Sequence, residues 1–167
     1  PTTDDGTPLC FLPEWVNELH AWPKLWKHHS AQPQADLINN MAKEENEPWL
    51  KRYGGLISSE WLFPKALQVF HESPKCFATT KRFIEGGDWL VWKLCGREMR
   101  SACQAGYKGL WNIKEGYPSF SFFEKLSKGF GEIKDKLSCK VYPAGTCAGR
   151  LTSEMASKLN LFPGIPV

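Results

Sequence analysis

The sequence predicts an α/β fold, in which helices alternate with short apolar strands. Two observations support this prediction. Several segments place apolar residues three and four positions apart, which is the spacing of one face of a helix. Short apolar stretches bounded by glycine or proline lie between these segments. Hydrophobic residues make up 42% of the 167 residues and charged residues 23%, a composition typical of a globular domain.

The first part of the chain is expected to hold one well-defined helix. An Asp5-Gly6 turn followed by CFL at 10–12 indicates a loop and then a short strand. Ser30 followed by Pro33 is typical of a helix start. An apolar stripe at helical spacing then precedes the charged sequence KEENE, and it comprises Ala35, Ile38, Met41 and Ala42.

Two further helices and an extended segment are expected in the middle of the chain. Pro64 suits the first turn of a helix whose apolar face includes Leu67 and Phe70. A second helix is predicted over 81–94, with Gly86-Gly87 weakening its middle and Gly96 ending it. The following segment, 101–111, is rich in small residues with little helical tendency. We expect a strand or extended turn there, whose glycines let the backbone pass close to another group.

The last part of the chain is expected to hold two more helices and two strands. Ser119 or Ser121 caps the first helix, and Ser121 with Glu124 matches a capping box. KVYPAG indicates a strand ending in a turn, Thr152 caps a second, short helix, and FPGIPV turns at Pro163-Gly164 into a strand. The core-facing stripe of the first helix comprises Phe123, Leu126, Phe130, Ile133 and Leu137.

Composition argues against several classes of protein. The net charge of +3 is too small, and the basic residues too scattered, to predict a nucleic-acid partner. The apolar runs are too short to span a membrane, and we expect no secretory signal. The chain starts at Pro1 rather than Met, which is consistent with a piece of a longer chain. The six cysteines form no C-x-x-C pair, so we expect reduced thiols in a cytosolic protein, although three disulfides are arithmetically allowed.

Few recognised chemical motifs occur in the chain. There is no G-x-x-x-x-G-K-[ST] loop and no G-x-G-x-x-G, so no phosphate-binding loop is predicted. His28 and His29 are adjacent but lack the spacing of a zinc site, and no metal ligand is predicted. Eight tryptophans are many for this length. They suit either a large core or stacking surfaces for sugar rings, and a core is the simpler interpretation.

Two charged residues are candidates for a binding site. Lys108 lies between Gly106 and Gly109, among small and aromatic residues. Its chemistry suits a ligand contact as well as a loop lysine whose stem lies on a neighbouring ring. Glu60 precedes an apolar helix, where an acidic residue in the first turn is favoured by the helix dipole, and a polar ligand contact is the alternative.

Seven segments, in the same order, resemble the bacterial L-ribulokinases of the FGGY carbohydrate kinase family. They are LWKHHSAQ, GGLISSEWLFPK, FIEGGDWLVWKLCG, RSACQAGYKGLW, GYPSFSFF, GRLTSEMASKLNL and PGIPV. AGYKGLW and ISSEW are more similar to ribulokinases than to the glycerol or xylulose branches. LWKHH departs from the LWKDH usual in ribulokinases, because His28 stands in place of Asp.

The resemblance implies a fold of two actin-like ATPase domains with ribonuclease H-like sheets and helical insertions. Residues 1–167 would form the later part of the N-terminal sugar-binding domain, without the C-terminal domain. The activity implied is ATP-dependent phosphorylation of L-ribulose to L-ribulose 5-phosphate in L-arabinose catabolism. It implies a cytoplasmic enzyme without a nucleic-acid or membrane partner, and it is compatible with a homodimer of the complete enzyme.

The resemblance also assigns roles to residues. Lys108 matches the family lysine that hydrogen-bonds the ribulose, and Glu60 falls at a polyol-contacting position where the residue type differs among relatives. The family's general-base aspartate would lie beyond Val167, so no catalytic residue is assigned here. ATP and Mg²⁺ would be bound mainly by other parts of the enzyme, and the chain alone would be inactive. The alternatives are a kinase for another ketopentose or a pentitol, and a non-catalytic carbohydrate-binding or interaction module.

Overall fold

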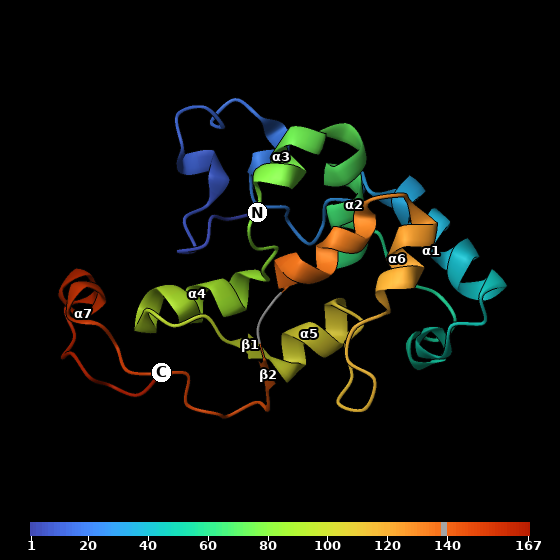
Figure 1. Cartoon of the computed structure of the whole chain (residues 1–167). Helices are drawn as coiled ribbons and strands as arrows, with labels where there is room; N and C mark the ends of the chain where they lie inside the picture. The colour runs from blue at the N-terminus through green and yellow to red at the C-terminus, as the bar shows by residue number, and fades with distance from the viewer. Residues whose placement is uncertain (138–139) are drawn as a thin grey trace.

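The computed structural model describes residues 1–137 and 140–167, and helices dominate it (Figure 1). Two short parallel strands, β1 (Arg100–Ser101) and β2 (Val141–Tyr142), pair with Arg100 opposite Val141. The α-helices are α1 (Gln32–Glu44), α2 (Leu62–Glu72), α3 (Pro74–Thr79), α4 (Gly86–Cys95), α5 (Ala102–Lys108), α6 (Phe120–Leu126) and α7 (Ser153–Leu159). The 3-10 helices are η1 (Leu9–Phe11), η2 (Leu19–Ala21), η3 (Pro48–Tyr53) and η4 (Phe130–Leu137).

The predicted helices α1 and α2 are confirmed, and they pack against each other. Pro33 and Pro64 each lie in the first turn of their helix, where a missing N–H costs no hydrogen bond. Ser30 does not cap α1, because its hydroxyl donates to Gln68 Oε1 on α2 at 3.1 Å. This bond ties the start of α1 to its neighbour.

The predicted single helix after residue 119 is instead two helices, α6 and η4, which pack on each other. Gly129 interrupts it with a positive φ of 91°, and the Glu124 carboxylate accepts the Gly129 N–H at 3.0 Å. The capping box with Ser121 is therefore wrong, and Ser119 caps α6 by accepting the Phe122 N–H at 3.0 Å. The core-facing stripe is confirmed nonetheless, because all five of its residues are buried: Phe123, Leu126, Phe130, Ile133 and Leu137.

An aromatic cluster fills the core between α2, α3, α6 and η4. The Phe70 ring lies 4.9 Å from Phe77 and 5.5 Å from Phe130, between ring centroids. Phe123 lies 4.7 Å from Phe63 and 5.6 Å from Phe130. Tilted and edge-to-face rings at these distances stabilise a core beyond the area they bury. This cluster holds α2 in place, and α2 forms one wall of the site described below.

Two predicted boundaries in the first hundred residues are wrong. Residues 9–11 form the 3-10 helix η1 rather than a strand. Helix α4 starts at Gly86, not at 81, because Arg82 pairs with Thr2 in an isolated bridge and Phe83 N donates to the Lys136 carbonyl at 3.0 Å. Gly86-Gly87 thus begin the helix, where they cost little, and Gly96 ends it as predicted with a φ of 72°.

The segment 101–111, predicted to be a strand or extended turn, is mainly the helix α5. Ser101 ends β1 and caps α5, accepting the Gln104 N–H at 3.1 Å. The buried Asp88 of α4 accepts the Ser101 N–H at 3.1 Å, which joins α4 to the start of α5. The local sequence lacks an apolar helical stripe, so this helix depends on its cap and its tertiary contacts.

The C-terminal part of the chain follows the prediction closely. β2 is a strand, and Thr152 caps α7 by accepting the Met155 N–H at 3.2 Å. Gly164 turns the chain with a φ of 84°. The end of the chain then pairs in extended form, with Ala148 N donating to the Val167 carbonyl at 2.7 Å.

The described residues include no helix that is both long and apolar enough to cross a bilayer. Five cysteines of the described part are free thiols, and Cys139 lies outside it. The free cysteines are Cys10, Cys76, Cys95, Cys103 and Cys147.

Candidate functional site

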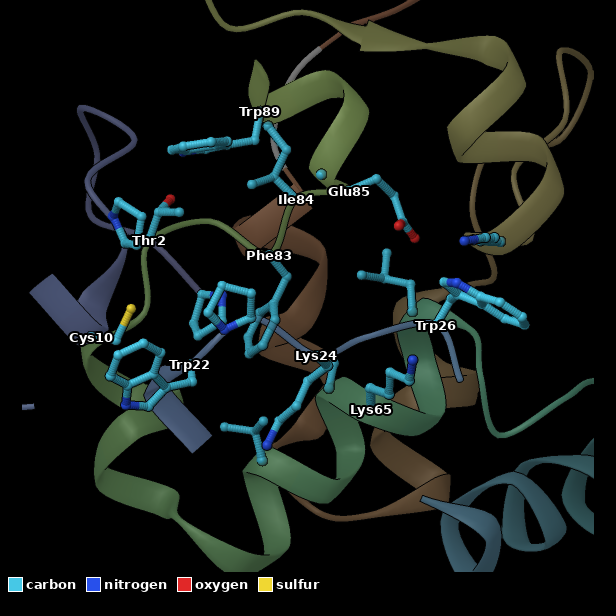
Figure 2. Close-up of a pocket in the computed structure, with 18 of the residues that line it drawn as sticks. Thr2, Cys10, Trp22, Lys24, Trp26, Lys65, Phe83, Ile84, Glu85 and Trp89 are labelled. Carbon is cyan, nitrogen blue, oxygen red and sulfur yellow. The ribbon is translucent and has the colours of Figure 1, made fainter. Parts of the chain in front are cut away.

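A cavity of about 320 Å³ lies among the N-terminal segment, α2, the start of α4 and the end of α5. Both predicted site residues, Lys108 and Glu60, line it, although they are far apart in the sequence. Figure 2 shows the side chains of Glu85, Lys65 and Trp26 toward one end of the cavity, whereas Trp22 and Cys10 lie at the other. A concave site with apolar walls and a few polar groups is the usual form of a small-molecule site.

Lys108 is the last residue of α5, and its half-buried side chain lines the cavity. The C-terminal end of a helix favours a cation. A residue outside α5 holds the end of this helix in place, because the Tyr53 hydroxyl donates to the Gly106 carbonyl at 2.6 Å. Tyr107 lies against Trp61, with ring centroids 6.0 Å apart. The lysine is thus held in the wall of a cavity and not in a solvated loop.

The two glycines beside Lys108 have different roles. A Cβ at Gly109 would lie 2.9 Å from the Ala105 carbonyl oxygen and 3.3 Å from the Tyr117 ring. A Cβ at Gly106 would meet only the Trp111 carbonyl oxygen, at an ordinary 3.5 Å. The predicted close approach of the backbone is confirmed at Gly109, and Gly106 has room for a side chain.

We expect Gly109→Ala to destabilise the protein and displace Lys108. The added methyl meets a backbone oxygen that cannot move without unwinding the last turn of α5, and such overpacking costs about 1–3 kcal/mol. Thermal unfolding of the complete protein measures the change. Gly106→Ala is the matched control, because alanine inside a helix is more favourable than glycine by about 0.5–1 kcal/mol. Equal unfolding temperatures for the two variants would contradict this account of Gly109.

Glu60 lies two residues before the first residue of α2, outside its first turn. Its carboxylate oxygen Oε1 is 3.3 Å from His29 Nε2, and the other ring nitrogen of His29 is 3.4 Å from the Ser59 hydroxyl. The dipole of α2 therefore does not explain Glu60. His29, to which sequence reasoning gave no role, orients the Glu60 carboxylate at the rim of the cavity.

Lys65 and Glu85 also line the cavity, and sequence reasoning missed both as site residues. Lys65 is only 8% exposed, and its Nζ donates to the Leu25 carbonyl at 2.6 Å. Burial lowers the pKa of Lys65. Burial also raises the pKa of Glu85, against the opposing charges of Lys108 and Lys65. The signal that could have identified Lys65 is a lysine within the apolar stretch of α2, where a buried charge requires a partner.

The tryptophans divide between core and cavity. Trp49 and Trp92 are buried. Trp22, Trp26 and Trp89 line the cavity, and Trp26 remains 65% exposed there. The core interpretation is therefore confirmed for Trp49 and Trp92, and sugar stacking on the three cavity tryptophans stays a prediction. Indole rings at the cavity offer flat apolar faces of the kind on which sugar rings stack.

The part of the chain that the structure describes brings together no group of three histidine, cysteine, aspartate or glutamate side chains that could hold a metal. His28 and His29 do not share such a cluster. The described residues therefore offer no ready-made cage of protein ligands for a metal ion.

Comparison with solved structures defines the class of fold. The chain superposes with a TM-score of 0.65 on a xylulose kinase from Brucella ovis, at 17% identity over 86% of this chain and 28% of that one. A gluconate kinase from Lactobacillus acidophilus gives the same score at 16% identity, over 85% of this chain and 27% of that one. The fold is that of the sugar kinases, which confirms the predicted α/β class.

Curated sequences specify the similarity further. The chain is 47% identical over its whole length to the ribulokinase of Bacillus licheniformis and 48% identical over 99% of its length to that of Mycolicibacterium smegmatis. The predicted resemblance to bacterial ribulokinases is thus confirmed. The chain spans about 30% of the length of these relatives. A scan against models of protein families found no match.

Proposed function

We propose that the complete protein containing this chain is a kinase that phosphorylates L-ribulose to L-ribulose 5-phosphate with ATP. In this proposal it acts in the cytoplasm, in L-arabinose catabolism. Residues 1–167 supply the later part of its N-terminal, sugar-binding domain. The observation that supports this most is the cavity that Lys108 and Glu60 share, in a chain similar to ribulokinases from end to end.

The polar groups of the cavity suit a neutral sugar. Near its α5 end they are two lysines and two glutamates, Lys65, Lys108, Glu60 and Glu85, whose formal charges balance. Lys24 also lines the cavity, but its Nζ is 3.3 Å from the Leu19 carbonyl oxygen and 3.2 Å from His20 Nδ1. A ketose presents several hydroxyl groups and a carbonyl. Lysine donates to such acceptors and glutamate accepts from such donors.

Within the proposed reaction this chain binds and orients the sugar. Lys108 donates hydrogen bonds to the ketose, and Glu60 accepts one from a hydroxyl. Trp26 and Trp22 cover the sugar and exclude water. Phosphoryl transfer depends largely on positioning and on charge stabilisation, so holding the acceptor hydroxyl in one orientation is a large part of catalysis. The general base, ATP and Mg²⁺ are assigned to parts of the enzyme outside this chain.

A kinase for another ketopentose or a pentitol is the second candidate. The fold shared with a xylulose kinase and a gluconate kinase favours it, because one architecture accepts several sugars. A non-catalytic carbohydrate-binding module is less well supported, since relatives named as ribulokinases match the chain throughout.

The test is an ADP-release assay of the complete protein with ATP, Mg²⁺ and a panel of ketopentoses and pentitols. We expect the highest kcat/KM with L-ribulose. A higher value with another sugar would support the second candidate. Sugar binding without ADP release from any member of the panel would favour the module and contradict the proposal.

A further inference from the structure

Glu85 is placed at the cavity in an unusual way for a residue that starts a helix. It occupies the capping position of α4, yet its side chain accepts no hydrogen bond from the helix. Capping residues are normally short side chains that accept an N–H of the first turn. The Glu85 carboxylate instead projects into the cavity, toward the end where Lys65 and Trp26 lie (Figure 2).

No side-chain hydrogen bond or ion pair engages the Glu85 carboxylate within the part of the chain that the structure describes. Three cations act on it electrostatically, Lys108, Lys65 and Arg100, and the first two are also cavity residues. The Asp88 carboxylate acts on the pKa of Glu85 in the opposite direction. Glu85 is partly buried and lines the cavity, so its carboxylate is accessible to hydrogen-bond donors that enter the cavity. Burial accordingly raises the pKa of Glu85. The hydroxyl groups of a polyhydroxy ligand in the cavity would supply hydrogen-bond donors to this carboxylate.

We propose that Glu85 is a further substrate-binding residue, which accepts a hydrogen bond from a hydroxyl of the sugar at the end of the cavity where Lys65 also lies. This inference rests on the proposed function and deepens it. Glu85 and Lys108 then act on the same sugar as acceptor and donor. Together they select a sugar by the direction of its hydroxyl groups, because a hydroxyl that points away leaves the carboxylate unpaired.

The kinetic test uses Glu85→Ala and Glu85→Gln in the complete protein, with Glu44→Gln as the matched control. Glu44 is an exposed glutamate at the end of α1, away from the cavity. We expect kcat/KM for L-ribulose to fall roughly 10- to 100-fold in Glu85→Ala and about 3- to 10-fold in Glu85→Gln, with KM for ATP unchanged. The control should match the wild type.

A second measurement identifies the hydroxyl. The same variants are assayed with 1-deoxy-, 3-deoxy- and 4-deoxy-L-ribulose. For the analogue that lacks the contacted hydroxyl, Glu85→Ala and the wild type should have the same kcat/KM. The inference would be overturned if Glu85→Ala lowered kcat/KM equally for all three analogues, or if it left kcat/KM for L-ribulose unchanged.

Thermal unfolding separates binding from a structural role. Above the ordinary pKa of glutamate, the unfolded chain carries an ionised Glu85, while the fold disfavours that charge. The folded state therefore loses stability as pH rises, and Glu85→Gln removes this loss. We expect its Tm at neutral pH to equal or exceed that of the wild type. A Tm several degrees lower would show that Glu85 is structural.

A wild type without activity on any sugar would instead overturn the proposed function, and this inference with it.

Discussion

Replacing Lys108 with alanine in the complete protein is expected to lower kcat/KM for the sugar by roughly 10- to 100-fold. The physical reason is the loss of a charge-assisted hydrogen bond to the ligand, worth about 1.5–3 kcal/mol in a site shielded from water. The affinity for ATP should hardly change, because ATP is bound elsewhere in the proposed enzyme. Steady-state kinetics with each substrate varied in turn measures both effects.

Lys114→Ala is the matched control for Lys108. Lys114 lies six residues further along, exposed in the loop after α5, and it does not line the cavity. The Lys114→Ala variant should have the same kcat/KM for the sugar as the wild type. If Lys108→Ala behaves in the same way as the control, Lys108 contributes no sugar contact, and its placement serves only the end of α5.

The second large effect is expected for the isolated chain. Residues 1–167 alone, mixed with ATP, Mg²⁺ and L-ribulose, should release no ADP above background. The acceptor hydroxyl needs a base, and the transferred phosphoryl group needs donors and a metal to balance its charge. The described residues bring together no cluster of metal-ligating side chains, and the chain contains no recognised phosphate-binding loop.

Circular dichroism on the same sample shows whether the isolated chain has folded, so that inactivity can be interpreted. Weak binding of L-ribulose, measured by calorimetry, is compatible with the prediction because the cavity residues are all in this chain. Sugar-dependent ADP release from a homogeneous sample would contradict it. In that case the chain would contain a complete active site.

Much of the helical structure was predictable because its causes are local. The apolar stripe of α1, Pro64 in the first turn of α2 and the Thr152 cap of α7 are all confirmed. Each depends on residues within one or two turns of one another. The candidate site was predictable only in part: Lys108 and Glu60 were identified through a resemblance, and no local pattern links them.

The errors occurred where distant contacts outweigh local preference. Segment 101–111 has a composition that favours an extended chain, yet Asp88 and the Ser101 cap make it helical. Residues 81–85 fit a helical pattern, but the bridge between Thr2 and Arg82 holds them extended. The Asp88–Ser101 and Thr2–Arg82 contacts cannot be read from a window of neighbouring residues, because the partners lie more than ten positions apart, whereas the Ser101 cap is local.

By itself, the sequence determined the α/β class, the buried stripes and the similarity to ribulokinases, since these follow from periodicity and from residue identity along the chain. Only the tertiary structure decided that Glu60, Lys65, Glu85 and Lys108 line one cavity. Folding places α2, α4 and α5 around that space, where Lys65 is buried and the other three charged groups are partly buried. Burial and the approach of distant charges depend on the three-dimensional packing, and they shift the pKa values of Lys65 and Glu85 in opposite directions.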